Sequence, residues 1–361
     1  MQREQGNGKT VYVGLSGGVD SSVSAYLLKK AGYHVVGVFI KVWQPDFVPC
    51  TWREDRLDAM RIAAQLNIPF RTLDLEKEYK EGVIDYLLSE YKKGRTPNPD
   101  VFCNKEVKFG AFYNWARNEG ADYVATGHYA QSILNKKTGT YELHRSPDKS
   151  KDQSYFLWTL SQDILAHVLF PVGCLHKTEV RTIAENTGLM TAKKKDSQGL
   201  CFISNVDMKS FLKHFIETKK GNVLNETGEV IGQHEGALLY TIGERHGFTI
   251  TRKTASDAPY YVVQKNISQN TITVSNDPET VVHSTSRYTI ANLLFRSREQ
   301  ESVSVTAQIR YHGEYHEATL YPSKNEIMFK DPLLAPLGQS IVFYKDTVCL
   351  GGAIIDTPKP H

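Results

Sequence analysis

Long apolar runs are missing from this chain of 361 residues, and charge of one sign does not dominate it. No stretch approaches the roughly 20 apolar residues of a membrane-spanning helix, so we expect no contact with a membrane. Residues 1–10 are polar and lack both the apolar core of a signal peptide and the basic amphipathic pattern of a transit peptide. We therefore expect a cytoplasmic protein. A formal net charge of +3 permits local basic patches but does not by itself require a nucleic-acid partner.

Cysteine is scarce, with five residues at wide spacings and no CxxC pair. The odd number and the spacing argue against a disulfide framework and a standard zinc site, and we assign no metal-ligating residue. Two cysteines lie in loops shaped by proline or glycine. Cys103 follows Asn98-Pro99-Asp100 near an expected helix N-terminus, and Cys201 follows a lysine cluster whose charge favours a thiolate. Taken alone, each is as easily a small buried hydrophobe, which is how we interpret Cys50, Cys174 and Cys349.

A glycine- and serine-rich segment, Gly14 to Ser22, lies between a predicted strand at residues 11–13 and a predicted helix that ends near Gly32. Such a turn directs backbone N–H groups and the positive end of the helix at one point, which suits a phosphate. The segment has neither the Lys-Ser/Thr of a Walker A loop nor the GxGxxG pattern. Asp20 within it could cap the helix or hold a magnesium ion.

Strands and helices alternate through the first half of the chain. Strands are predicted at 34–40, 70–75 and 122–126, with helices at 57–66 and 77–92 between them. This order predicts an α/β fold with a doubly wound parallel sheet, in which ligands bind at the C-terminal strand ends. The nucleotide-contacting residues predicted at these ends are Gly14, Leu15, Ser16, Gly17, Gly18, Val19, Asp20, Ser21, Ile40 and Gly127.

Farther along the chain we expect a hairpin at 129–145 and helices at 155–169, 177–186 and 208–219. Beyond about residue 221 the segments become short and strand-like, separated by glycine and asparagine turns. We therefore predict three domains: residues 1–215 form the α/β domain, 216–282 a small β-rich central domain, and 283–361 a C-terminal all-β barrel.

Several motifs occur together in a fixed order. They are Ser16 to Ser22, Gly94-Arg95-Thr96-Pro97-Asn98-Pro99-Asp100, Cys103-Asn104, Ala125-Thr126-Gly127-His128-Tyr129, Lys151 to Phe156, Cys201-Phe202-Ile203 and Cys349-Leu350-Gly351-Gly352. The first motif alone looks like the loop of the ATP-pyrophosphatase superfamily. The combination resembles the bacterial-type tRNA-specific 2-thiouridylases along nearly the whole chain.

The resemblance implies that ATP and Mg²⁺ serve to adenylylate O2 of the wobble uridine, position 34, of tRNA, with release of pyrophosphate. Sulfur from a cysteine persulfide then replaces that oxygen to give 2-thiouridine. The implied partners are tRNAs for lysine, glutamate and glutamine and a persulfide-carrying sulfur donor protein, and the implied state is a monomer. The persulfide falls on Cys201 and the second catalytic thiol on Cys103.

Two routes for sulfur stay open at this point. Cys103 attacks the persulfide and releases sulfide, or the terminal sulfur attacks the base directly and Cys103 resolves the product. Asp100 is either a general acid/base beside Cys103 or the N-cap of the following helix.

The tRNA-contacting residues follow from the resemblance as well. They are Asn98, Pro99 and Asp100 at the target base, and His128, Lys151, Asp152, Gln153, Arg310, Tyr311 and Gln339 elsewhere. The nearby lysines, Lys149, Lys151 and Lys193–Lys195, either neutralise phosphates or form ordinary solvated surface. Without the resemblance, His128 would be interpreted as a satisfied polar residue at a strand end.

Two local departures from the family pattern precede Cys201, at Gln198 and Leu200, and the segment 46–55 is shorter and less acidic than is common. Two rival functions remain: another adenylylating enzyme acting on a small metabolite, and a non-catalytic tRNA- or nucleotide-binding protein. The two loop cysteines argue against the first rival. The intact loop and both cysteines argue against the second.

Overall fold

The computed structural model describes residues 6–48, 52–196, 207–251, 258–277, 285–296 and 301–359. The chain forms two compact units. Unit 1 comprises Met1–Ile84, Pro99–Asn205 and Tyr344–Leu350, and unit 2 comprises Asp85–Asn98, Val206–Phe343 and Gly351–His361. The expected division at 215 and 282 into three domains stays a prediction.

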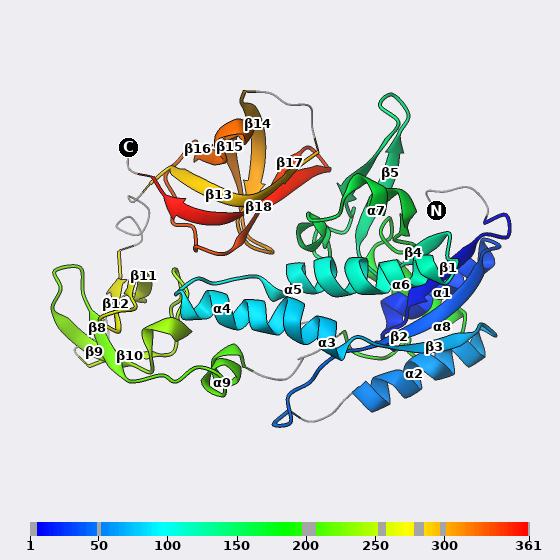
Figure 1. Ribbon diagram of the computed structural model, residues 1–361, viewed down its shortest axis with the longest axis horizontal. Helices are drawn as coiled ribbons and strands as arrows, with labels where there is room; N and C mark the ends of the chain where they lie inside the picture. The colour runs from blue at the N-terminus through cyan, green and yellow to red at the C-terminus, as the bar shows by residue number, and fades with distance from the viewer. Residues whose placement is uncertain are drawn as a thin grey trace. The chain divides into compact units, whose positions relative to one another are not determined.

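A parallel sheet forms the centre of unit 1, with strand order β3-β2-β1-β4-β7 (Figure 1). Its strands are β1 (Thr10–Gly14), β2 (His34–Lys41), β3 (Phe70–Asp74), β4 (Tyr123–Ala125) and β7 (Val168–Leu169). The strand order reverses at β1, which pairs with β2 on one side and β4 on the other. A doubly wound sheet binds ligands at such a reversal. The predicted α/β fold is confirmed.

Helices cover both faces of this sheet. Val11 and Val13 of β1 share one core cluster with residues of α1 (Val19–Lys30), α2 (Trp52–Gln65) and α8 (Lys177–Asn186). On the opposite face the Tyr12 ring packs edge-on against Trp115 of α6 (Tyr113–Asn118), with ring centroids 5.6 Å apart. Both faces of β1 are therefore buried, which explains its continuous apolar sequence.

The helical segments of unit 1 include two stretches of π-helix. One, η1 (Lys80–Asp85), follows α3 (Glu76–Tyr79) and ends at the first residue of a unit 2 segment, which continues as α4 (Tyr86–Lys92). The other, η2 (Cys103–Phe112), continues α5 (Pro99–Phe102) and leads into α6. Unit 1 also contains the 3-10 helix η3 (Ser154–Leu157) and α7 (Gln162–His167). The predicted helix at 155–169 is thus wrong, because its last residues form strand β7 beside Val124 and Ala125.

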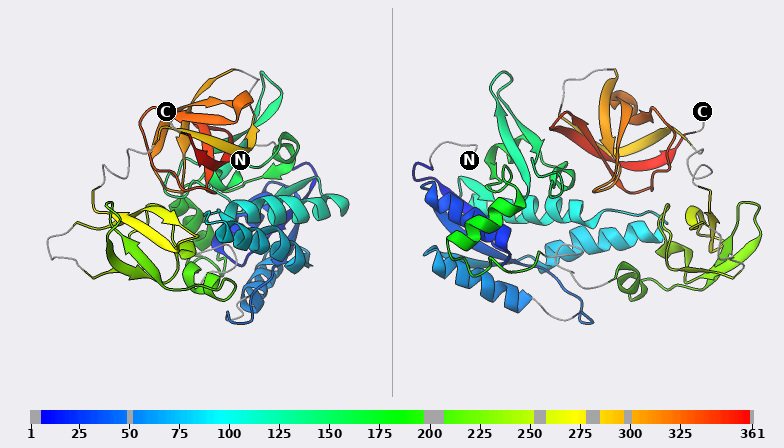
Figure 2. Two further views of the ribbon diagram at one scale, coloured as in Figure 1. Left: turned by 60° about the vertical axis from the view of Figure 1, so that its left-hand side comes forward. Right: turned by 180° about the vertical axis from the view of Figure 1, so that it is seen from behind.

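A hairpin of β5 (Ala130–Asn135) and β6 (Thr140–Arg145) projects from unit 1 (Figures 1 and 2). Its second strand pairs with the start of β18 (Val348–Pro358), where Cys349 lies opposite Leu143. Tyr344 is fully buried in the same unit, with the Arg145 guanidinium 3.7 Å from the centre of its ring. Residues late in the sequence therefore complete unit 1.

Unit 2 contains a five-stranded sheet and a barrel. The sheet order is β10-β9-β8-β12-β11, and β12 pairs with β8 in parallel whereas the other neighbours are antiparallel. Its strands are β8 (Gly221–Leu224), β9 (Val230–His234), β10 (Phe248–Ile250), β11 (Tyr261–Asn266) and β12 (Thr271–Ser275). Short helices accompany it: α9 (Met208–Lys213) and η4 (Ala237–Leu239). Since α9 ends at Lys213, the predicted helix 208–219 is too long.

The barrel closes because its first strand pairs with both β16 and β18. Its strands are β13 (Arg287–Phe295), β14 (Val303–Gln308), β15 (Tyr315–Tyr321), β16 (Glu326–Phe329), β17 (Ser340–Lys345) and β18, with the 3-10 helix η5 (Pro322–Lys324) between β15 and β16. The predicted C-terminal all-β barrel is confirmed. Within the described ranges, no helix is long and apolar enough to span a bilayer.

Candidate active site

The glycine-rich loop leaves β1 at Gly14 and enters α1 at Gly18, which is the N-cap residue. Gly17 has φ of +74°, and a Cβ there would lie 2.6 Å from the Asp55 carbonyl oxygen, so only glycine fits. The Ser21 and Ser22 hydroxyls both donate to the Gly18 carbonyl oxygen, at 3.1 and 2.8 Å. These bonds fix the loop that the sequence predicted.

Gly127 brings the end of β4 against the same loop. A Cβ on Gly127 would lie 2.8 Å from both the Asp20 carbonyl carbon and the Ser21 nitrogen, which no side chain tolerates. Ile40, the other predicted nucleotide-contacting residue outside the loop, lies buried near the end of β2. The first turn of α1 and two predicted strand ends therefore belong to one edge of the sheet.

Asp20 does not cap α1, because Gly18 is the N-cap and the Asp20 carboxylate bonds elsewhere. The Tyr129 hydroxyl donates to Asp20 Oδ1 at 2.7 Å. The Lys177 ammonium, at the start of α8, lies 2.7 and 2.8 Å from the two carboxylate oxygens. The capping alternative is therefore wrong, and Asp20 instead holds a tyrosine and a lysine from distant parts of the chain.

Asp196 is the second carboxylate bound by Lys177, at 2.9 Å. Lys151 and Arg181 also contact it, at 2.8 and 2.6 Å. Burial opposes ionisation of Asp196, but the hydrogen bonds from Lys151 and Lys177 outweigh it and lower the pKa of this carboxyl to about 2. Asp196 is thus ionised at neutral pH and is surrounded by three cations.

The segment Lys151-Asp152-Gln153 is fastened beside Tyr129. Gln153 and Tyr129 exchange hydrogen bonds: the Tyr129 N–H donates to Gln153 Oε1 at 3.0 Å, and the Gln153 N–H donates to the Tyr129 carbonyl at 2.8 Å. The Asp152 carboxylate accepts hydrogen bonds from the Ser146 and Ser154 N–H groups and from the Ser154 hydroxyl. The three residues therefore hold a loop together, and their contact with tRNA stays a prediction.

His128 is buried between aromatic rings. Its Nδ1 lies 2.7 Å from the Thr126 hydroxyl, and its ring contacts Phe109 and Phe170. Desolvation, with the nearby Lys108 charge, lowers the pKa of His128 well below the ordinary histidine value, so the ring is neutral. Its predicted contact with tRNA is untested.

Cys103 begins the π-helical segment η2 and is buried, with 1% of its surface exposed. The helical run starts at Pro99, four residues before Cys103, so the helix N-terminus lies earlier than the expected position near Cys103. Asp100 is the second residue of that helix and not its N-cap, so its carboxylate lies in the first turn, where the helix dipole favours negative charge. Cys201, Cys50 and the departures at Gln198 and Leu200 lie outside the described residues.

Of the other predicted tRNA-contacting residues, Asn98, Arg310, Tyr311 and Gln339 belong to unit 2. Arg310 is exposed in the turn after β14, and the Tyr311 ring packs edge-on against His312. Gln339 lies beside Gly338, whose Cβ position would be 2.9 Å from the Arg95 Cβ in the same unit. Asn98 ends a segment of unit 2, and Pro99 begins one of unit 1.

Sequence reasoning missed Tyr129, Lys177, Arg181 and Asp196 as members of the site. Lys177 looks like an ordinary first-turn residue of an amphipathic helix, and its partner Asp20 lies 157 residues away. The available signal was the charge of Asp20: a carboxylate in a phosphate-binding loop requires a cation to offset it.

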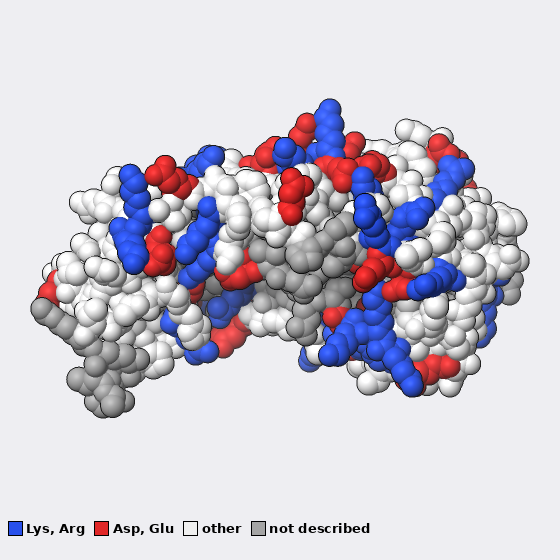
Figure 3. All heavy atoms as spheres, turned by 90° about the horizontal axis from the view of Figure 1, so that it is seen from below, with Lys and Arg blue, Asp and Glu red and all other residues white. Residues whose placement is uncertain are grey.

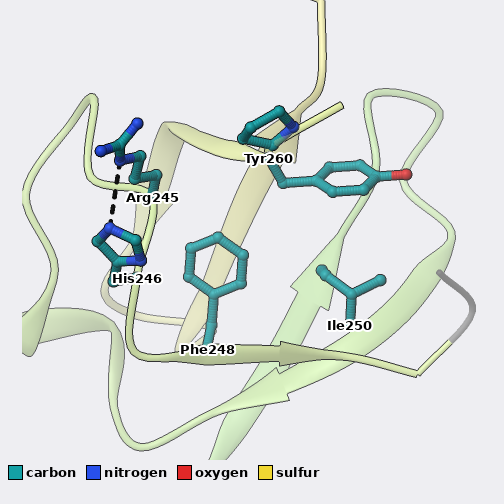
Figure 4. Close-up of a pocket in the computed structure, with 6 residues that line it drawn as sticks. Arg245, His246, Phe248, Ile250 and Tyr260 are labelled. Carbon is teal, nitrogen blue, oxygen red and sulfur yellow. Dashed lines mark hydrogen bonds between the residues drawn. The ribbon is translucent and has the colours of Figure 1, made fainter. Parts of the chain in front are cut away.

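Lysines and arginines lie intermixed with acidic side chains on the face shown in Figure 3. A pocket of about 360 Å³ lies in unit 2, lined by Arg245, His246, Phe248, Ile250, Pro259 and Tyr260. In it the Arg245 Nε donates to His246 Nε2 at 3.2 Å (Figure 4). The pocket shares no residue with the predicted site.

A magnesium ion fits the loop only as a companion of phosphates. Among the described residues, no group of three or more His, Cys, Asp or Glu side chains forms a metal site. Mg²⁺ is usually held by one or two carboxylates together with substrate phosphates and water. Asp20 supplies one such carboxylate at the loop.

The sheet, the glycine-rich loop at the reversal of strand order and the Gly127 contact define a nucleotide-binding α/β protein of the HUP class. Residues 9–205 match the family model described as "tRNA methyl transferase HUP domain". Residues 209–276 match "tRNA methyl transferase PRC-barrel domain", and residues 285–355 match "Aminomethyltransferase beta-barrel domain".

Curated relatives match almost end to end. The tRNA-specific 2-thiouridylase MnmA of Streptococcus equi subsp. equi is 45% identical over 359 residues, covering 97% of this chain and 96% of the relative. That of Listeria monocytogenes serovar 1/2a is 46% identical over 355 residues, covering 96% and 94%. The chain belongs to the tRNA-specific 2-thiouridylase family.

Two solved structures show a distant likeness over about half of the chain. The U34-tRNA thiolase NcsA from Methanococcus maripaludis is 20% identical with a TM-score of 0.35, covering 54% of this chain and 62% of that one. A 4-thiouridine synthetase, solved in complex with RNA and ATP, is 20% identical with a TM-score of 0.36, covering 55% and 46%.

Proposed function

We propose that this protein is an ATP-dependent tRNA 2-thiouridylase, which replaces O2 of the wobble uridine with sulfur. The observation that carries the proposal is the near end-to-end match to curated 2-thiouridylases at 45–46% identity. The loop supports it physically. Its serine hydroxyls and glycines fix the start of α1, whose backbone N–H groups suit the phosphates of ATP.

The reaction needs activation because a uracil carbonyl oxygen is a very poor leaving group. Attack of O2 on the α-phosphate of ATP forms an adenylyl ester at the base and releases pyrophosphate. The backbone N–H groups at the start of α1 stabilise the charge that develops on the phosphates. When magnesium accompanies ATP, Asp20 would hold it, and the ion would neutralise part of that charge.

Sulfur then arrives as a persulfide on Cys201. In one route the Cys103 thiolate attacks the inner sulfur, hydrosulfide leaves and attacks C2, and AMP departs from the base. In the other route the outer persulfide sulfur attacks C2 and AMP departs from the base. The Cys103 thiolate then attacks the Cys201 sulfur, which breaks the bond between the two persulfide sulfurs and releases the thiolated base. Both routes end in a Cys103–Cys201 disulfide, which a dithiol must reduce by two electrons before the next turnover.

Asp100 is the candidate acid/base for the Cys103 thiol. It lies three residues before Cys103 in the same helical run, in the turn whose N–H groups favour an ionised carboxylate. The predicted contacts of Asn98, Pro99 and Asp100 with the target base belong to this proposal. So do those of the other tRNA-contacting residues, because an anticodon base must leave its stack before chemistry on it can occur.

The finer assignments complete the proposal: tRNAs for lysine, glutamate and glutamine as substrates, a persulfide-carrying donor protein, a monomeric state and a cytoplasmic location. The test is mass spectrometry of tRNA nucleosides after incubation with ATP, Mg²⁺ and sulfide. We expect 2-thiouridine at position 34. Its absence under these conditions, with pyrophosphate or without it, would sink the proposal.

Cys201→Ser separates this proposal from its rivals. The variant should still release pyrophosphate with tRNA and ATP but should form no 2-thiouridine from a persulfide donor. Full activity on a small metabolite would favour another adenylylating enzyme. Binding of tRNA without any pyrophosphate release by the wild type would favour a non-catalytic binding protein.

A further inference from the structure

One ammonium group joins the nucleotide loop to the segment that precedes Cys201. Lys177 Nζ lies 2.7 and 2.8 Å from the Asp20 oxygens and 2.9 Å from Asp196 Oδ1. We propose that Lys177 is a positioning residue that couples ATP activation at the loop to sulfur delivery, because it fixes Asp20 and Asp196 together. The inference rests on the proposed function and adds Lys177 to the residues of that site.

Lys177 is held more firmly than an ordinary surface lysine. Its side chain is 12% exposed, and the ammonium lies 5.8 Å from the centre of the Tyr129 ring. Its backbone N–H donates to Asp148 Oδ2 at 2.9 Å, and it is the first residue of α8, between the N-cap residue His176 and Glu179, whose carboxylate accepts a hydrogen bond from the His176 N–H. Because both the backbone and the ammonium of Lys177 are bound, the side chain holds Asp20 and Asp196 in fixed positions. Most exposed ion pairs are too loosely held to do this.

The loop side of the bridge has an electrostatic purpose. A carboxylate in the first turn of α1 repels an incoming triphosphate, and Lys177 offsets that charge from the side of α8. Tyr129 donates to the same carboxylate and keeps it pointed at Lys177. Removal of the lysine would therefore weaken ATP binding through Asp20.

The other side of the bridge leads toward the sulfur-carrying cysteine. Asp196 precedes Cys201 by five residues in the sequence. Asp196 is fixed by Lys177, Lys151 and Arg181 together. Arg181 also donates to the Ala192 and Lys194 carbonyls at 2.7 and 3.0 Å, which holds the approach to this segment.

The test compares pyrophosphate released with 2-thiouridine formed, at saturating tRNA and sulfur donor. In Lys177→Met we expect the KM for ATP to rise about tenfold, as for loss of a hydrogen bond to a charged group. We also expect 2-thiouridine per pyrophosphate to fall below about half of the wild-type ratio. Asp196→Asn should lower that ratio while the KM for ATP stays within about twofold of wild type, since Asp20 keeps its lysine.

Lys177→Arg should restore at least half of the coupling, because a guanidinium can bridge two carboxylates. Lys30→Met, an exposed lysine at the other end of α1, is the matched control and should change neither quantity. Thermal melting checks that each variant is folded. An unchanged KM and ratio in Lys177→Met, or an arginine variant that is folded but as uncoupled as methionine, would overturn the proposal. Lack of thiolation by the wild type would instead contradict the proposed function itself.

Discussion

Tyr129 and Asp20 are joined by a hydrogen bond of 2.7 Å from the phenol to the carboxylate, across 109 residues of sequence. The backbone of the same tyrosine donates a hydrogen bond to the Gln153 side-chain oxygen and accepts one from the Gln153 N–H. Burial, followed by the nearby charge of Asp20, raises the pKa of Tyr129 far above the ordinary tyrosine value, so the phenol remains a donor at every working pH. The tyrosine thus links the nucleotide loop to the loop that follows the β5–β6 hairpin.

Tyr129→Phe tests this link. The ring and its packing remain, but one donor to the Asp20 carboxylate is lost. We expect the KM for ATP to rise about three- to tenfold, because Lys177 still binds Asp20 and compensates in part. Steady-state release of pyrophosphate in the presence of tRNA measures this. A KM equal to that of the wild type would show that the phenol does not orient Asp20.

Gly127→Ala tests the close approach of β4 to α1. The added Cβ would meet backbone atoms of Asp20 and Ser21 at 2.8 Å, so the strand end or the helix start must move. We expect a stability loss of about 1–3 kcal/mol and a severe loss of pyrophosphate release. Gly120→Ala is the control for an added methyl group without a close contact: no atom lies within 4 Å of the new Cβ, although the φ of +89° at Gly120, unlike the backbone at Gly127, strains any side chain. If both variants lose stability alike and keep activity, the close approach of Gly127 to the start of α1 is not needed for the reaction.

Asp196 predicts a pH dependence of stability. Its pKa in the folded chain is about 2, below its ordinary value of 3.8. A carboxyl with a lowered pKa stabilises the folded state above the unfolded pKa, and this contribution disappears as pH falls from about 4 to about 2. The stability difference between wild type and Asp196→Asn should therefore shrink over that range. Melting temperatures at pH 5 and pH 3 measure it, and a constant difference would contradict the assignment.

Cysteine exposure predicts an order of alkylation. Cys103 is 1% exposed at the start of η2, whereas Cys174 is partly exposed in the turn before α8. Iodoacetamide should therefore label Cys174 faster than Cys103 in the native protein without tRNA. Peptide mass spectrometry after timed quenching gives both rates. Equally fast labelling of Cys103 would mean that its surroundings open readily in solution.

The local part of the site was predictable from sequence, because apolar strands, glycine turns and helix periodicity are local signals. The predicted strand at 11–13 lies within β1, and the predicted helix at 177–186 coincides with α8. The helix predicted at 155–169 was wrong, since periodicity alone does not distinguish a short buried strand from a helix in an apolar run. Val168 and Leu169 form a strand because they pair in parallel with Val124 and Ala125 of β4.

The charged network was not predictable from local pattern. Lys177 joins carboxylates 157 residues before it and 19 residues after it, and no spacing in the sequence records such a contact. The position of Asp100 relative to its helix was also not predictable from local pattern. Whether it caps a helix depends on whether the helix begins at residue 99 or 101, and the proline at residue 99 tolerates the first helical position.

The strand pairing between β6 and β18 has a consequence for biosynthesis. Tyr344, whose hydroxyl lies 3.1 Å from that of Ser154, and Cys349 complete unit 1 although most of that unit is translated long before them. A growing chain therefore holds its ATP-binding half unfinished while the barrel strands are still being made. A chain released before residue 344 lacks the Tyr344 ring that packs under the Arg145 guanidinium. We therefore expect unit 1 of such truncated products to be cleaved readily by proteases. The order of synthesis thus keeps the nucleotide-binding unit incomplete until residue 350, shortly before residues 351–361 complete unit 2.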